Sequence, residues 1–164
     1  MLVALDVQYD DATAAATSAA VVFNAWDDAE PQSQHVVRTT GIAPYEPGAF
    51  FKRELPCLLA VLESLPAAPS IVVIDGYVTL GDKPGLGAHL WEALERRSPI
   101  IGVAKTKFHS AAAKELLRGG SLSPLYVTAV GIDLDDAAAH IQAMAGPHRI
   151  PTLLKRVDHL ARGR

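Results

Sequence analysis

Hydrophobic residues in the first quarter of the chain follow the pattern of three β-strands. Residues 2–9 are almost entirely apolar, with Asp6 as an exception, and residues 13–26 and 32–40 are rich in valine, threonine and alanine. Such runs predict strands, and the polar segment 27–31 is typical of a turn between the second and the third. The chain is therefore expected to begin with three strands that pair antiparallel.

A helix is predicted after a rigid turn. Residues 43–48 contain two prolines and a glycine, a composition that indicates a turn. From residue 49 to residue 65 the apolar residues recur every three or four positions, which predicts an amphipathic helix. Pro56 lies inside this pattern and is expected to kink the helix or restart it.

The rest of the chain alternates between short apolar runs and helical patterns. The runs 70–75 and 99–104 are typical of strands that are buried on both faces, as in parallel sheets. A glycine-rich loop lies between them, and the further predicted elements are a helix over 87–97, a short helix over 111–117, a strand over 125–130, and helices over 134–144 and 151–161. This order predicts an α/β sheet with an antiparallel edge, formed by residues 1–164 as a single domain.

Composition narrows the class of protein. Of the 164 residues, 49% are hydrophobic and 20% are charged, which allows a sizeable core and argues against a disordered tail. No apolar run approaches the length of a membrane span, so no membrane partner is expected. Cys57 is the single cysteine, which excludes an internal disulfide and favours a reducing, cytoplasmic location.

Charge is distributed unevenly along a chain whose net charge is −3. Residues 1–34 contain acids but no lysine or arginine, whereas residues 149–164 contain five basic residues and one acid, Asp158. Such a bipolar chain could present a basic face to phosphates. The alternative is an ordinary solvated helix face, and charge alone does not separate the two.

Three carboxylates occupy positions where core residues are expected. Asp6 interrupts an apolar strand, Asp75 ends a buried strand, and Glu54 lies near the apolar face of the first helix. Buried carboxylates are costly unless a cation compensates them, and hard oxygen ligands suit Mg²⁺, with Mn²⁺ as the alternative. Lys105 at the end of a further strand adds to this pattern. The alternative for each acid taken singly is a strand-end or surface group.

Several short segments carry a family resemblance in chain order. They read D-V-Q-Y at 6–9, P-Y-E-P-G at 44–48, F-K-R-E-L-P at 51–56, V-I-D-G at 73–76, G-L-G-A-H-L at 85–90, I-G-V-A-K at 101–105, P-L-Y-V-T at 124–128 and R-I-P at 149–151. Together they resemble the endonuclease V family, whose members are metal-dependent nucleases of deaminated nucleic acid. The resemblance implies a ribonuclease-H-like mixed sheet with flanking helices.

The resemblance also implies roles for individual residues. The metal ligands would be Asp6, Glu54 and Asp75, and Lys105 would stabilise charge at the scissile phosphate. Tyr45 would act as a wedge that helps to splay out the altered base, the alternative being an aromatic packed under the proline turn. The matching segments further suggest substrate contacts at Gly76 and His89, and Lys83 in the loop between these segments is a third candidate.

Near the C-terminus the resemblance leaves a choice. Asp158 falls where the family has an Asp or His that can join the metal site, and the neighbouring His159 is an equal rival. The implied reaction is cleavage near inosine in DNA, with RNA as the alternative substrate, by a monomer or weak dimer.

The match fails in two loops. The family's H-P-R segment is absent from residues 77–84, where Lys83 could replace a phosphate contact as a point charge, and a family G-H pair is absent at 130–132. Both losses fall on loops expected to contact nucleic acid, while the carboxylates are intact. The alternative functions are therefore a nucleic-acid-binding homologue with weak or lost cleavage, and a nuclease of the same fold that acts on RNA or another structure.

Overall fold

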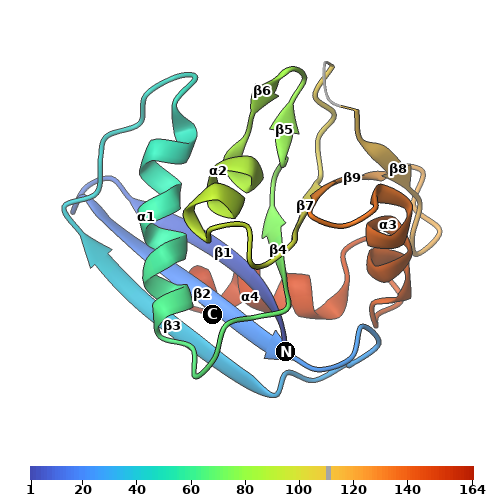
Figure 1. Cartoon of the computed structure of the whole chain (residues 1–164). Helices are drawn as coiled ribbons and strands as arrows, with labels where there is room; N and C mark the ends of the chain where they lie inside the picture. The colour runs from blue at the N-terminus through green and yellow to red at the C-terminus, as the bar shows by residue number, and fades with distance from the viewer. Residues whose placement is uncertain (110–111) are drawn as a thin grey trace.

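The computed structural model describes residues 1–109 and 112–164, which form one central sheet with helices on both faces (Figure 1). The elements are β1 (Leu2–Asp10), β2 (Ala15–Phe23), β3 (Ser33–Thr40), α1 (Phe50–Glu63), β4 (Ile71–Asp75), β5 (Thr79–Leu80), β6 (Lys83–Pro84), α2 (Leu86–Ala93), β7 (Ile100–Ala104), β8 (Lys114–Leu116), β9 (Leu125–Val130), α3 (Leu134–Ala143) and α4 (Thr152–Ala161).

The large sheet has the strand order β3-β2-β1-β4-β7-β9-β8. The first three strands pair antiparallel, as the sequence predicted, and β1, β4 and β7 run parallel to one another. Strands β9 and β8 then close the other edge in antiparallel pairing. Because these three strands are parallel, the carboxyl ends of β1, β4 and β7 point in the same direction. Ligands commonly bind beyond the carboxyl ends of the strands in open α/β sheets.

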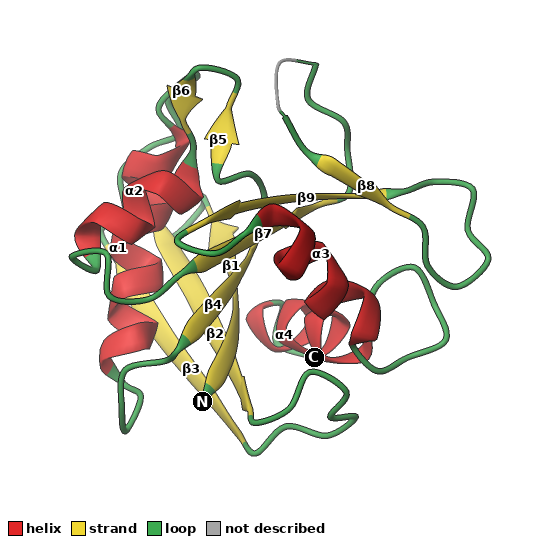
Figure 2. Ribbon diagram, turned by 45° about the vertical axis from the view of Figure 1, so that its right-hand side comes forward, coloured by secondary structure: helices red, strands yellow, loops and turns green. Residues whose placement is uncertain are grey.

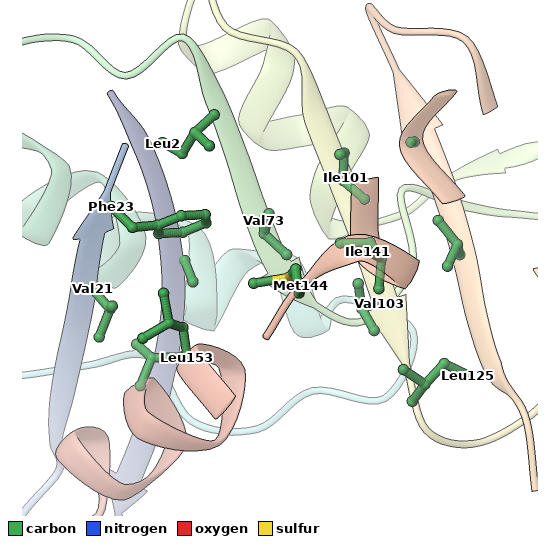
Figure 3. Close-up of a cluster of buried hydrophobic side chains, with 14 of the residues drawn as sticks. Leu2, Val21, Phe23, Val73, Ile101, Val103, Leu125, Ile141, Met144 and Leu153 are labelled. Atoms are coloured by element: carbon green, nitrogen blue, oxygen red, sulfur yellow. The ribbon is translucent and has the colours of Figure 1, made fainter. Parts of the chain in front are cut away.

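Alternation along each strand divides the core into two halves. Val3 and Leu5 of β1 pack under α1 and α2, whereas Leu2 and Ala4 pack under α3 and α4. Figure 2 shows the two pairs of helices on opposite sides of the sheet. Figure 3 shows the half under α3 and α4, in which Phe23 is fully buried beside side chains from several strands. Burying each such side chain contributes roughly 1.5–3 kcal/mol.

Three local predictions need correction. The helix predicted over 111–117 is wrong: residues 114–116 form strand β8, which pairs with β9, because the open edge of the sheet offers backbone hydrogen bonds that outweigh local helix propensity. The first residue of that prediction, 111, lies outside the described residues. Helix α2 ends at Ala93 instead of 97, since Glu95 and Arg96 adopt positive φ. Pro56 lies on the exposed side of one continuous helix, so the predicted restart is wrong, while the predicted kink stays a prediction.

The glycine-rich loop after β4 contains a small hairpin. Strands β5 and β6 pair antiparallel through Thr79 with Pro84 and Leu80 with Lys83, at the position where the sequence departs from the family pattern.

Among the described helices, none combines the length and the apolar character needed to cross a bilayer.

Candidate active site

Two of the three predicted carboxylates end up side by side on neighbouring strands. The parallel register pairs Leu5 of β1 with Ile74 of β4, so Asp6 and Asp75 follow directly at the next position of each strand. Both side chains line one pocket together with residues of α4. Asp6 is buried, with 6% of its surface exposed, whereas Asp75 is half exposed at the strand end.

Glu54 reaches the same end of the sheet from α1. It is buried, with 6% of its surface exposed, and lies on the helix side that also buries Arg53 and Cys57. The guanidinium of Arg53 covers the ring of Tyr9 at 3.8 Å and donates to Oδ1 of Asp11 at 2.8 Å. These contacts anchor the start of α1 to β1 and to the turn after it, which fixes the position of Glu54.

Asp158 and Lys105 complete the pocket shared by Asp6 and Asp75, called here the carboxylate pocket. Its free volume is about 30 Å³, which is room for at least one water-sized species. Nζ of Lys105 lies 3.9 Å from Oδ2 of Asp75. Glu54 does not line this pocket directly and approaches it from the α1 face of the sheet.

Burial and mutual repulsion make it hard to ionise the carboxyl groups of Asp6, Glu54 and Asp75. Burial raises the pKa of Asp6 to about 7, with the charge of Asp75 adding to the effect. Burial raises the pKa of Glu54 to about 8, and the charges of Asp6 and Asp75 contribute. The pKa of Asp75 is raised by burial too, although the Lys105 ammonium opposes the change. Since the charge of Asp75 acts on Asp6, and the charges of both act on Glu54, the three side chains belong to one electrostatic cluster.

Asp158 behaves differently because a cation holds it. Burial acts to raise its pKa, but the net shift is downward, because the hydrogen bonds from Arg162 and the positive charges of Arg162 and Lys105 favour its ionised form. Nε of Arg162 donates to both oxygens of Asp158, at 3.0 and 3.1 Å.

The donor set suits a hard divalent cation. Within the described part of the chain, Oδ2 of Asp6 and Oε2 of Glu54 are buried and have no hydrogen-bond partner, and an unsatisfied buried carboxylate is destabilising. All four candidate ligands offer carboxylate oxygens, the type that Mg²⁺ and Mn²⁺ prefer. In residues 1–109 and 112–164, no three His, Cys, Asp or Glu side chains stand close enough to form a ready-made metal cluster. The carboxylates therefore affect one another's ionisation, but they do not stand at the spacing of ligands that bind one common ion.

Comparison with known proteins decides the family. The family model described as Endonuclease V matches residues 1–134. Endonuclease V of Streptomyces avermitilis is 34% identical over 96% of this chain and 77% of its own length. The chain belongs to the endonuclease V family. A crystal structure of the Streptomyces avermitilis enzyme superposes with a TM-score of 0.83 at 30% identity, covering 99% of this chain and 79% of that one.

A more distant relative shows the same fold with nucleic acid bound. Endonuclease V of Ciona intestinalis, solved with a 24mer DNA that contains an inosine followed by a ribo-adenosine, gives a TM-score of 0.86 at 20% identity. The alignment covers 99% of this chain and 84% of that one. The two structural matches confirm the predicted ribonuclease-H-like sheet, and the family model with the Streptomyces avermitilis sequence confirms the family resemblance.

Tyr45 of this endonuclease V homologue projects from the surface. It lies in the turn before α1 with 62% of its surface exposed, and its ring meets the Phe50 ring edge-on at 6.4 Å between centroids. The alternative, an aromatic packed beneath the proline turn, does not agree with this exposure. The wedge role of this exposed ring stays a prediction.

The other predicted substrate contacts lie before, within and after the β5–β6 hairpin. Gly76 follows Asp75 with φ of +123° and donates its backbone N–H to the carbonyl of Val103. Lys83 is exposed on β6. His89 stacks on Phe51 with 3.7 Å between ring centroids, so it joins α2 to α1. A substrate contact by any of the three stays a prediction.

The structure adds residues that sequence reasoning missed. Arg162 holds Asp158, and its spacing of four residues on a predicted helix was the available signal. The hydroxyl of Tyr77 donates to the carbonyl of Thr106 at 2.6 Å and accepts from the backbone N–H of Phe108 at 3.0 Å. This clamp holds the segment that begins at Lys105, and no local sequence signal revealed it. Asp158 lines the carboxylate pocket whereas His159 does not, which favours Asp158 over its rival.

Proposed function

We propose that this chain is a metal-dependent endonuclease that hydrolyses a phosphodiester near a deaminated purine such as inosine. The ion would be Mg²⁺, with Mn²⁺ as the alternative, and the substrate would be damaged DNA, as in DNA repair. Membership of the endonuclease V family supports the nuclease activity. The inosine-containing DNA bound by the Ciona intestinalis relative supports the base specificity.

One observation carries the proposal: buried carboxylates from separate elements share a single electrostatic cluster at the carboxyl edge of the parallel strands. Asp6 and Glu54 each keep a buried oxygen without a partner among the described residues, and each has a raised pKa. A protein that needed only stability would gain from apolar residues at these positions. The arrangement is therefore best explained by a cation that binds there.

Asp6, Glu54 and Asp75 would hold the ion, with Asp158 as a further ligand. When bound, a divalent cation lowers the pKa of a water molecule and offsets the charge of a phosphodiester. Lys105, at 3.9 Å from Asp75, would place its ammonium group beside the same phosphate and stabilise the charge that develops on it. Hydrolysis would leave a 3′-hydroxyl and a 5′-phosphate on the 3′ side of the lesion.

Tyr45 would act as the wedge: its ring would enter the duplex, stack on a base there and help to splay out the altered base. Its exposed ring stands on a stiff turn, and base–aromatic stacking contributes about 1–3 kcal/mol per base. The β5–β6 hairpin, which replaces the family's H-P-R segment, would approach the strand with Lys83 as a point charge.

The test is cleavage of end-labelled oligonucleotides that carry one inosine, with Mg²⁺ or Mn²⁺ and with EDTA. We expect a single metal-dependent cut by the wild type and a loss of roughly a hundredfold or more in Asp75→Asn. Asp27→Asn is the matched control, because Asp27 is an exposed aspartate in the turn between β2 and β3. Absence of any cut by the wild type, or equal activity of both variants, would refute the proposal.

The altered hairpin favours a second candidate, a homologue that binds nucleic acid with little or no cleavage. It predicts salt-dependent binding without a cut under either metal. A panel of inosine, uracil, abasic and flap substrates in both DNA and RNA separates this candidate from a nuclease that prefers RNA or another structure.

A further inference from the structure

A second pocket opens beside the carboxylate pocket and has the opposite charge. This basic pocket has a volume of about 340 Å³, and its polar lining consists of Lys105, His148, Arg149, Lys155, Asp158 and His159. It shares four lining residues with the carboxylate pocket, Lys105, Ile150, Leu154 and Asp158, so the two pockets are contiguous. The two charged residues among them, Lys105 and Asp158, therefore lie at the border between the acidic pocket and the basic pocket.

The charge of the basic pocket is positive in a protein that is acidic overall. Lys105, Arg149 and Lys155 carry fixed positive charges, against the single carboxylate of Asp158. That carboxylate is already bound on both oxygens by Arg162. Since the whole chain has a net charge of −3, this local excess is a feature of the pocket rather than of the surface in general, and it favours an anionic ligand.

Hydrogen bonds from two arginines to backbone carbonyls organise the wall of the basic pocket. Nη2 of Arg149 donates to the carbonyls of Lys105 and Pro124, both at 2.7 Å, which joins the segment after β7 to the segment before β9. Arg118 is buried and donates to four carbonyls within residues 144–149, which fixes the segment that leads into α4. A wall held in this way loses little conformational freedom when a ligand binds.

We propose that the basic pocket binds a phosphodiester of the substrate strand that flanks the scissile one, with Lys155 as its main contact. The inference rests on the proposed function, because it assumes that the scissile phosphate of the substrate strand lies at the carboxylate pocket. A strand whose scissile phosphate lies at Lys105 carries its next phosphate away from the acidic compartment. The adjacent basic pocket receives that charge, and His148 and His159 offer further polar groups to it.

The first experiment measures binding of a labelled single-stranded inosine oligonucleotide by fluorescence anisotropy, with Ca²⁺ in place of Mg²⁺, over a range of salt concentrations. Lys155→Ala should weaken binding roughly threefold to tenfold and reduce the slope of log Kd against log salt by about 0.7. Arg97→Ala is the matched control. It removes one exposed positive charge just before the start of β7, whereas Lys105 follows the end of that strand.

The second experiment locates the phosphate. In a series of oligonucleotides, one linkage at a time is replaced by an uncharged methylphosphonate. One linkage next to the scissile bond should weaken wild-type binding when it is neutralised and should have no further effect in Lys155→Ala. The proposal is overturned if Lys155→Ala binds with the same salt slope as Arg97→Ala, or if its effect adds fully to that of every neutralised linkage.

Cleavage with Mg²⁺, assayed in parallel, separates this proposal from the proposed function. A protein that cuts the inosine strand but is indifferent to Lys155 retains its nuclease function and loses the phosphate site. A protein that shows the Lys155-dependent linkage without cutting retains the phosphate site and loses the nuclease function. Absence of binding to every oligonucleotide refutes both.

Discussion

Replacing Glu54 by glutamine is expected to stabilise the metal-free protein at high pH and to leave it almost unchanged at low pH. Glu54 is buried, and one of its oxygens has no partner among the described residues. Burial, followed by the charges of Asp6 and Asp75, raises its pKa to about 8. Glutamine keeps the shape of the side chain but cannot ionise, so it removes the cost of a buried charge.

The size of the effect follows from the interval between the two pKa values. In the unfolded chain Glu54 titrates near 4.5, and in the folded protein near 8. At about 1.4 kcal/mol for each pH unit, ionising this side chain costs the folded state up to about 5 kcal/mol. Because part of the shift comes from the charges of Asp6 and Asp75, we expect Glu54→Gln to recover about 2–4 kcal/mol at pH 9.

The sign of the pH dependence of stability follows from the number of protons that the folded and unfolded states bind. Between pH 4.5 and 8 the folded protein holds a proton on Glu54 that the unfolded chain has released, so the free energy of unfolding falls as pH rises through this window. The same holds for Asp6 between pH 3.8 and about 7. The assay is urea unfolding followed by circular dichroism, in EDTA, at each pH from 5 to 9.

Glu63→Gln is the control, because Glu63 is an exposed glutamate on the same helix. We expect its unfolding free energy to follow the wild type at every pH, while Glu54→Gln follows a shallower curve. Adding Mg²⁺ at pH 8 should then stabilise the wild type more than Glu54→Gln, since the cation offsets the charge that glutamine lacks. If wild type and Glu54→Gln lose stability in parallel from pH 6 to 9, the buried ionisation is not the cause and the reasoning is wrong.

Three further substitutions test the surroundings of the site. Tyr77→Phe removes the hydroxyl that holds Thr106, so single-turnover cleavage should slow roughly threefold to tenfold while unfolding changes by less than about 1.5 kcal/mol; an unchanged rate would contradict the clamp. Gly102→Ala brings Cβ to 2.5 Å from the carbonyl of Gly76, which should lower the urea unfolding free energy by about 1–3 kcal/mol. Arg118→Leu leaves four carbonyls of residues 144–149 without their donor, and it should destabilise by about 3 kcal/mol and speed proteolysis of that segment.

The sequence by itself determined the order of most elements and the family. Hydrophobic periodicity is a local property, so the three opening strands, α1 and the buried strands β4 and β7 followed from it directly. Asp6 and Asp75 stood out for the same reason, because a carboxylate within or at the end of an apolar run is visible without coordinates. The family then followed from short segments in a fixed order.

Tertiary structure decided everything that depends on contacts between distant segments. The segment 114–116 became a strand because a sheet edge was open beside it. Asp158 was preferred over His159 because Asp158 lines the carboxylate pocket, whereas His159 lines only the basic pocket. The mutual effects on pKa, the clamp formed by Tyr77 and the basic pocket likewise depend on distances across the fold. Pairing, burial and electrostatic coupling arise between residues that are far apart in the chain, and no local pattern encodes those distances.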